Sequence, residues 1–133
     1  MTPPPAHVGA PAGPGPTTAS VTRWVEGYVT AWTSNARADI EVLFTDDAEY
    51  RESPYETRWI GRDAIVEGWH SRWDWQSGGW EFEWSITAID GWDVVITGIG
   101  RYVKLGDFDN LWTVTFDGSG RCSRFVMVNT ERS

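Results

Sequence analysis

Residues 80–91 read Trp-Glu-Phe-Glu-Trp-Ser-Ile-Thr-Ala-Ile-Asp-Gly, and this stretch decides the fold class. Between Trp80 and Ile86, large apolar residues alternate with Glu and Ser, which is the two-residue period of a strand with one buried face. Asp90-Gly91 then predicts a tight hairpin, because Asp and Gly tolerate the backbone conformation at the centre of such turns. We predict that three more strands complete a four-stranded meander, over residues 92–104, 110–116 and 121–129.

Three helices are predicted before residue 80. The first follows a Ser20 N-cap and carries one apolar stripe at three- and four-residue spacing, formed by Val21, Trp24, Val25, Tyr28 and Trp32. The second is short and buries Ile40, Leu43 and Phe44. The third opens at Gly61 and turns Ile65, Trp69 and Trp73 inward, after a brief strand over residues 48–52 that precedes Pro54. Helices followed by strands predict an α+β domain, with the helices packed on one face of an antiparallel sheet.

Composition limits the class of protein further. The 133 residues are enough for one domain, and their net charge of −8 argues against a nucleic-acid or anionic-membrane surface. The sequence contains no apolar run long enough to span a membrane and no secretory leader, so we expect a cytoplasmic protein. Residues 1–18 contain six of the seven prolines and no charged side chain. We therefore expect a disordered Pro/Gly/Ala-rich extension over residues 1–18 and a folded domain over residues 19–133.

No metal or cofactor motif is present. Neither His7 nor His70 has a second ligand at metal-binding spacing, and there is no phosphate loop, nucleophile elbow or dinucleotide fingerprint. His70 lies one position from the Trp69 face, which predicts a rim position. The single cysteine, Cys122, has no activating histidine and is expected to be a buried structural thiol. We expect no metal and no cofactor, which leaves proton transfer or binding alone.

Several polar residues fall among the predicted aromatic faces. Tyr28 is predicted to be buried, where its phenol needs a partner and could donate to a ligand oxygen. Arg51 and Glu52 point to opposite faces of a regular strand, so they cannot both enter one pocket. Asn110 and Trp112 share a face of one strand, and both are neutral donors suited to holding an oxygen. The last strand likewise presents Phe125, Met127 and Asn129 on one face.

The region from residue 20 to 130 resembles the nuclear transport factor 2-like superfamily. The phrases that carry the resemblance are Tyr28-Val-Thr-Ala-Trp32, Ile40-Glu-Val-Leu-Phe-Thr-Asp-Asp-Ala-Glu-Tyr50, Arg51-Glu-Ser-Pro-Tyr55, Gly61-Arg-Asp-Ala-Ile65, Asn110-Leu-Trp-Thr-Val-Thr-Phe-Asp117 and Gly120-Arg-Cys122. The resemblance implies a cone, in which a curled antiparallel sheet wraps a long third helix and leaves an open end for an apolar ligand. Members include steroid isomerases, SnoaL-like polyketide cyclases, dehydratases, epoxide hydrolases and proteins that only bind or dimerise, so the fold does not settle the function.

The resemblance can be carried over position by position. Tyr28 matches the oxyanion tyrosine of the ketosteroid isomerases, but their catalytic aspartate falls on Ser53, with Glu52 one residue early, and their second oxyanion donor falls on Trp112. Steroid isomerisation by that mechanism is therefore not expected. An epoxide-hydrolase role for Arg101 is disfavoured by its apolar same-face neighbours, which are Ile99 and Val103. A dehydratase pair could be formed by His70 with Tyr28 or Tyr50, and the cyclases require only one acid or histidine in an aromatic cavity.

Two functions are consistent with these residues. In the first, a cofactor-free isomerase, cyclase or dehydratase acts on a small apolar oxygenated molecule. Tyr28 and Trp112 then hold the substrate oxygen, Glu52 or His70 moves the proton, and the remaining pocket residues are Trp24, Trp32, Tyr50, Trp69, Trp73, Tyr102, Asn110, Phe125, Met127 and Asn129. In the second, the chain is a non-catalytic binding or dimerisation module. Both expect a small hydrophobic molecule and a second copy as partners, and both require a hollow interior.

Overall fold

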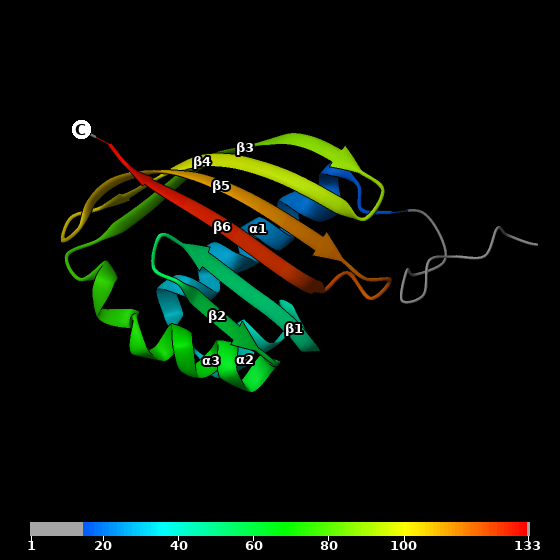
Figure 1. Cartoon of the computed structure of the whole chain (residues 1–133), viewed down its shortest axis with the longest axis horizontal. Coiled ribbons are helices and arrows are strands. Elements are labelled where there is room, and N and C mark those ends of the chain that lie inside the picture. Colours follow the sequence, from blue (N-terminus) through cyan, green and yellow to red (C-terminus); the bar gives the residue numbers. More distant parts are fainter. Residues whose placement is uncertain (1–14, 133) are drawn as a thin grey trace, which may run out of the picture.

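The structure is a computed structural model that describes residues 15–132 (Figure 1). Its helices are α1 (Thr18–Ser34), α2 (Arg37–Glu41) and α3 (Arg62–Ser71), followed by the single 3-10 turn η1 (Trp73–Gln76). Its strands are β1 (Phe44–Ser53), β2 (Thr57–Ile60), β3 (Trp80–Asp90), β4 (Asp93–Tyr102), β5 (Gly106–Phe116) and β6 (Cys122–Glu131). The predicted α+β class is confirmed, with the sheet curled over α1 and with α2 and α3 beside β1 and β2.

The six strands form one sheet in the order β2-β1-β6-β5-β4-β3. The four-stranded meander β3 to β6 is antiparallel throughout, as the alternation in the sequence predicts. The expectation of an entirely antiparallel sheet is wrong at one place, because β1 pairs with β6 in parallel. Parallel neighbours need a long connection between them, and the chain supplies it through α3 and the whole meander. The sheet is therefore mixed.

The sheet also differs from prediction at its turns and its first edge. Strand β1 begins at Phe44, so Phe44 belongs to this strand and not to the predicted second helix. The unpredicted strand β2 folds back on β1 after Pro54. At the β3–β4 hairpin, Asp90 pairs with Asp93, so the turn falls on Gly91-Trp92, one residue later than predicted. Gly91 takes a φ of 59°, a left-handed conformation that glycine accepts without strain.

The helices keep their predicted order but not all of their predicted details. Thr17, not Ser20, is the N-cap of α1, and the two residues form a reciprocal capping box. The long helix is α1, with 17 residues, whereas α3 has 10. Because α3 ends at Ser71, the predicted inner residue Trp73 falls on η1 and is 54% exposed.

The N-terminal extension predicted for residues 1–18 falls mostly outside the described residues, and His7 lies there too. Of its last four residues, Thr17 caps α1 and Thr18 begins it. Within residues 15–132, none of the helices is both long and apolar enough to cross a membrane.

Candidate functional site

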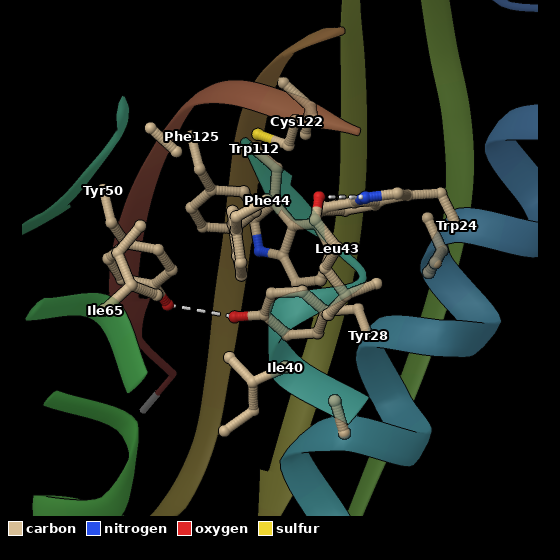
Figure 2. Close-up of a cluster of buried hydrophobic side chains, with 14 of the residues drawn as sticks. Trp24, Tyr28, Ile40, Leu43, Phe44, Tyr50, Ile65, Trp112, Cys122 and Phe125 are labelled. Carbon is tan, nitrogen blue, oxygen red and sulfur yellow. Dashed lines mark hydrogen bonds between the residues drawn. The ribbon is translucent and has the colours of Figure 1, made fainter. Parts of the chain in front are cut away.

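The space between α1, α3 and the sheet is filled by an aromatic cluster, which closes most of the expected hollow. Figure 2 shows Trp24, Tyr28, Phe44, Trp112 and Phe125 packed together in it. The Trp24 indole is satisfied internally, because its Nε1 donates to the Leu43 carbonyl oxygen at 3.0 Å. The predicted pocket residues Trp24, Trp69 and Phe125 therefore belong to the solid core, and they do not line the small cavity described next.

A small cavity remains beside this cluster. Residues of α1, η1 and the strands β1, β3, β4, β5 and β6 line it. Its volume is about 30 Å³, room for about two water molecules. Two of its lining residues, Trp75 and Trp80, were not predicted. The predicted site residues that line it are Tyr28, Trp32, Tyr50, Glu52, Tyr102, Asn110, Trp112, Met127 and Asn129. In place of the expected hollow cone, the structure has a small cavity with a polar and aromatic lining.

Glu52 is the only residue with an acidic or basic side chain among those that line the cavity. It lies two positions after Tyr50 on β1, so both side chains project from the same face of the strand, and Glu52 is only 8% exposed. Arg72 donates to its Oε1 at 2.6 Å, and the Asn129 amide donates to its Oε2. Burial raises the pKa of Glu52, and the opposing effects of Arg72 and Asn129 do not cancel that shift. The inward orientation that the sequence left open is therefore present.

Arg72 is held by three aromatic rings and one hydroxyl. Its guanidinium carbon lies 4.5 Å from the centroid of the Trp59 ring and 4.6 Å from that of Trp75, with Tyr55 farther away at 5.8 Å. Its second terminal nitrogen donates to the hydroxyl of Thr57. Stacking and hydrogen bonding together fix the guanidinium plane, so Arg72 positions the Glu52 carboxylate.

Two phenols form a second polar group at the cavity. The hydroxyls of Tyr28 and Tyr50 lie 3.0 Å apart and face each other in Figure 2, joined by a dashed line. Burial raises the pKa of both phenols well above the ordinary value, so both keep their protons at neutral pH. Tyr28 also packs against Trp112, with ring centroids 4.5 Å apart. One hydroxyl donates to the other, which leaves one phenolic hydrogen for a further acceptor.

Besides the three core residues, two more predicted site residues lie outside the cavity. His70 is exposed at the end of α3, and its Nε2 lies 3.0 Å from the carbonyl oxygen of Asn35. Trp73 faces solvent on η1, as described above. Arg51 points away from Glu52 and donates to Glu49 at 2.6 Å, which confirms that the two neighbours occupy opposite faces of β1. Arg101 likewise contacts Glu83, at 2.9 Å, and not the cavity.

Sequence reasoning missed Arg72, Trp75 and Trp80. Trp80 carried a usable signal, because it shares the inner face of β3 with Phe82 in the alternating pattern. Arg72 and Trp75 carried none, since they follow α3 in a turn where periodicity gives no direction. Within residues 15–132, no three His, Cys, Asp or Glu side chains come close enough together to hold a metal ion.

A family model described as the SnoaL-like domain matches residues 25–130, nearly the whole folded part of the chain. The chain belongs to the SnoaL-like domain family. Among curated proteins, none matches this SnoaL-like sequence.

Solved structures agree with this SnoaL-like fold. A SnoaL-like protein of unknown function from Burkholderia thailandensis E264 superposes with a TM-score of 0.70 at 18% identity, over 89% of this chain and 99% of that one. A candidate polyketide cyclase from Sinorhizobium meliloti gives 0.66 at 20% identity, over 81% and 97%. An LEH-like epoxide hydrolase from M. tuberculosis gives 0.59 at 19% identity, over 86% and 85%. At these identities the similarity establishes the fold alone.

Proposed function

We propose that this SnoaL-like protein binds a small, largely apolar, oxygenated molecule and transfers a proton on it without a cofactor, as an isomerase, cyclase or dehydratase does. The observation that carries the proposal is the buried carboxylate of Glu52 on the wall of an otherwise aromatic cavity. Burial raises the pKa of Glu52, which brings it closer to the range in which a carboxyl group both takes and returns a proton.

The phenol pair supplies the complementary hydrogen-bond donor. Tyr50 lies on the same strand face as Glu52, and the free hydrogen of the Tyr28–Tyr50 pair can reach an oxygen in the same small cavity. In this mechanism Glu52 takes a proton from the carbon next to a carbonyl group. The C–H electron pair forms the new C=C bond, and the negative charge that develops on the oxygen is stabilised by the phenol and by Trp112. Asn129 holds the carboxylate in orientation through its hydrogen bond.

The size of the cavity restricts the ligand. A volume of about 30 Å³ accepts a polar head group, whereas typical ligand pockets measure about 300–1,000 Å³. We therefore propose that the ligand body enters where Trp75 lies, since this ring sits on the single turn η1 and is only partly buried. Rotation of the Trp75 side chain would join the cavity to solvent and leave the aromatic core undisturbed, while the Trp59 ring and the Thr57 hydroxyl still hold Arg72.

Exchange of α-hydrogens tests the proton-transfer step directly. Cyclopentanone in D2O is followed by proton NMR with the wild type, with Glu52→Gln and with Glu56→Gln. Glu56 is a matched control, because it is an exposed acid four positions along the same segment. We expect the wild type and E56Q to accelerate exchange equally and E52Q to lose at least a hundredfold, as removal of a general base does. Equal exchange by E52Q and the wild type would refute the role of Glu52.

The alternative is a non-catalytic binding or dimerisation module. It is favoured by the hydrogen bonds that already satisfy both Glu52 oxygens and by the small cavity. Ketone binding without any α-exchange would support it. For the dimer, the outer sheet face offers Leu111 and Val128, which are cross-strand neighbours and 44% and 41% exposed. Light scattering of the wild type and of Leu111→Glu tests this: a dimer that becomes a monomer in the variant supports pairing through the outer face.

A further inference from the structure

Three indole N–H groups on the wall of the cavity have no hydrogen-bond acceptor. The Nε1 atoms of Trp32, Trp80 and Trp112 are buried and unpartnered within the described residues. The Trp32 N–H lies close enough to the Tyr102 hydroxyl to oppose the rise in the Tyr102 pKa that burial causes, but the two groups do not reach hydrogen-bond geometry. A buried donor without an acceptor destabilises the folded state, so three around one cavity need an explanation. Trp69 Nε1 is also unpartnered, but Trp69 lies in the core and does not line this cavity.

The opposite wall has almost no acceptor left to satisfy these donors. Glu52 accepts from Arg72 and Asn129, and the Asn129 side-chain oxygen in turn accepts from the Asn110 amide at 2.5 Å. This chain of bonds fixes the direction of both amides, because a carboxylate can only accept. The side-chain oxygens left over are those of Asn110 and of the tyrosine hydroxyls, and each hydroxyl also carries a donor hydrogen of its own. Free donors therefore outnumber free acceptors in the cavity.

The cavity also lacks a cation for an anionic head group. Among its lining residues the only charged side chain is the acid Glu52, and the guanidinium of Arg72 is already paired with it. A neutral group that only accepts hydrogen bonds is the chemistry that fits. A carbonyl group has about the size of the cavity and offers two lone pairs, whereas a hydroxyl or an amine would add a donor where donors are already in excess.

We propose that Trp32, Trp80 and Trp112 form a donor site that reads the carbonyl oxygen of the ligand and rejects the corresponding alcohol. This inference deepens the proposed function by naming the substrate class as neutral carbonyl compounds, and it rests on the cavity being the ligand site. It does not depend on Glu52 turning the ligand over. Specificity follows from the cost of leaving buried donors unpaired when the wrong group is bound.

The test uses indole N–H resonances in ¹⁵N-labelled protein, titrated with cyclopentanone and, separately, with cyclopentanol. Single Trp→Phe variants at the three positions assign the signals. We expect the ketone to shift the Trp32, Trp80 and Trp112 signals downfield and to bind about tenfold more tightly than the alcohol, with each Phe variant weakening ketone binding about fivefold. Trp24 is the matched control, because its buried N–H already donates to a carbonyl oxygen and its signal should stay in place.

The outcomes separate this inference from the proposed proton transfer. Equal affinities for ketone and alcohol, or ketone binding that leaves the cavity indole signals unmoved, would overturn the carbonyl site even if E52Q abolishes exchange. Shifted indole signals without α-hydrogen exchange would uphold the carbonyl site and remove the catalytic role of Glu52. Absence of binding by either probe to the wild type would overturn both, and because the wild type is the sample, that result does not depend on a variant folding correctly.

Discussion

Replacement of Gly68 by alanine should destabilise the fold and loosen the site together. Gly68 is buried in α3, and a Cβ at this position would lie 2.4–2.5 Å from three atoms of the Trp59 indole. Carbon atoms in contact normally lie about 3.5–4.0 Å apart, so the ring must move by about 1 Å. Trp59 is not free to do so, because it stacks on Tyr50 with ring centroids 5.1 Å apart and supports Arg72 on its ring.

The expected cost follows from two opposing terms. Overpacking of a well-filled interior costs about 1–3 kcal/mol, and contact with three atoms of a rigid ring places Gly68 at about 3 kcal/mol. Alanine is favoured over glycine inside a helix by about 1 kcal/mol. The free energy of unfolding should therefore fall by about 2 kcal/mol in G68A. Displacement of the Trp59 ring should also release Arg72 and lower the rate of the α-hydrogen exchange proposed for Glu52.

Gly27→Ala provides the matched control for the helix term. Gly27 lies inside α1, and its added Cβ would meet only the Leu43 Cδ2 methyl, at 3.2 Å. That methyl ends a flexible side chain, so G27A should raise the free energy of unfolding by about 0.5–1 kcal/mol. Urea unfolding at 25 °C measures the free energy of unfolding of both variants. Without the Trp59 indole the clash is absent, so adding G68A to W59L should cost less than adding G68A to the wild type. Equal or greater stability of G68A relative to G27A would refute the packing argument.

Three further predictions concern buried titratable groups. Because burial raises the pKa of Glu52, the contribution of this carboxyl group to stability is complete below its unfolded pKa of about 4.3 and is lost as pH rises through its folded pKa. Urea unfolding should therefore show Glu52→Gln gaining stability over the wild type with rising pH. A difference in the free energy of unfolding that stays constant with pH would contradict this. Arg72→Met should raise the pKa of Glu52 further, seen in the infrared carboxylate band, and cost about 3–5 kcal/mol at neutral pH. Burial raises the pKa of Cys122, so DTNB should label the thiol only after unfolding, and rapid native labelling would contradict this.

Sequence pattern was sufficient for the meander and for the direction of Glu52 relative to Arg51. Both rest on the two-residue period of strands, which is local and which tertiary packing seldom reverses. The same period placed Asn110 with Trp112 and Met127 with Asn129, and all four line the cavity. Strand β2 escaped prediction because four residues are too few to establish a period. Its pairing with β1 depends on a turn at Pro54 that the strand pattern does not specify.

The size of the cavity could not be predicted, because it depends on side-chain rotamers and not on which face a residue occupies. Trp24, Trp69 and Phe125 all point inward as predicted, yet they interlock with Phe44 and leave no space between them. The role of Arg72 was hidden for a different reason. Its partner Glu52 is 20 positions away in sequence, and the rings that hold it come from two separate turns and β2. A contact between such distant segments leaves no local periodicity.

Stability alone does not account for the Glu52–Arg72 pair. A buried ion pair generally gives no more stability than apolar side chains of similar volume, because desolvation offsets the attraction. Here the balance is unfavourable for the carboxylate, since its pKa remains raised even with the Arg72 guanidinium 2.6 Å away. The proposed proton transfer gives this arrangement a purpose. Without Arg72 the buried acid would keep its proton too firmly to act as a base, and without burial it would lose the proton too readily to return it. Burial and Arg72 act on the Glu52 pKa in opposite directions, and in the proposed function this carboxyl group on the cavity wall exchanges its proton with a ligand.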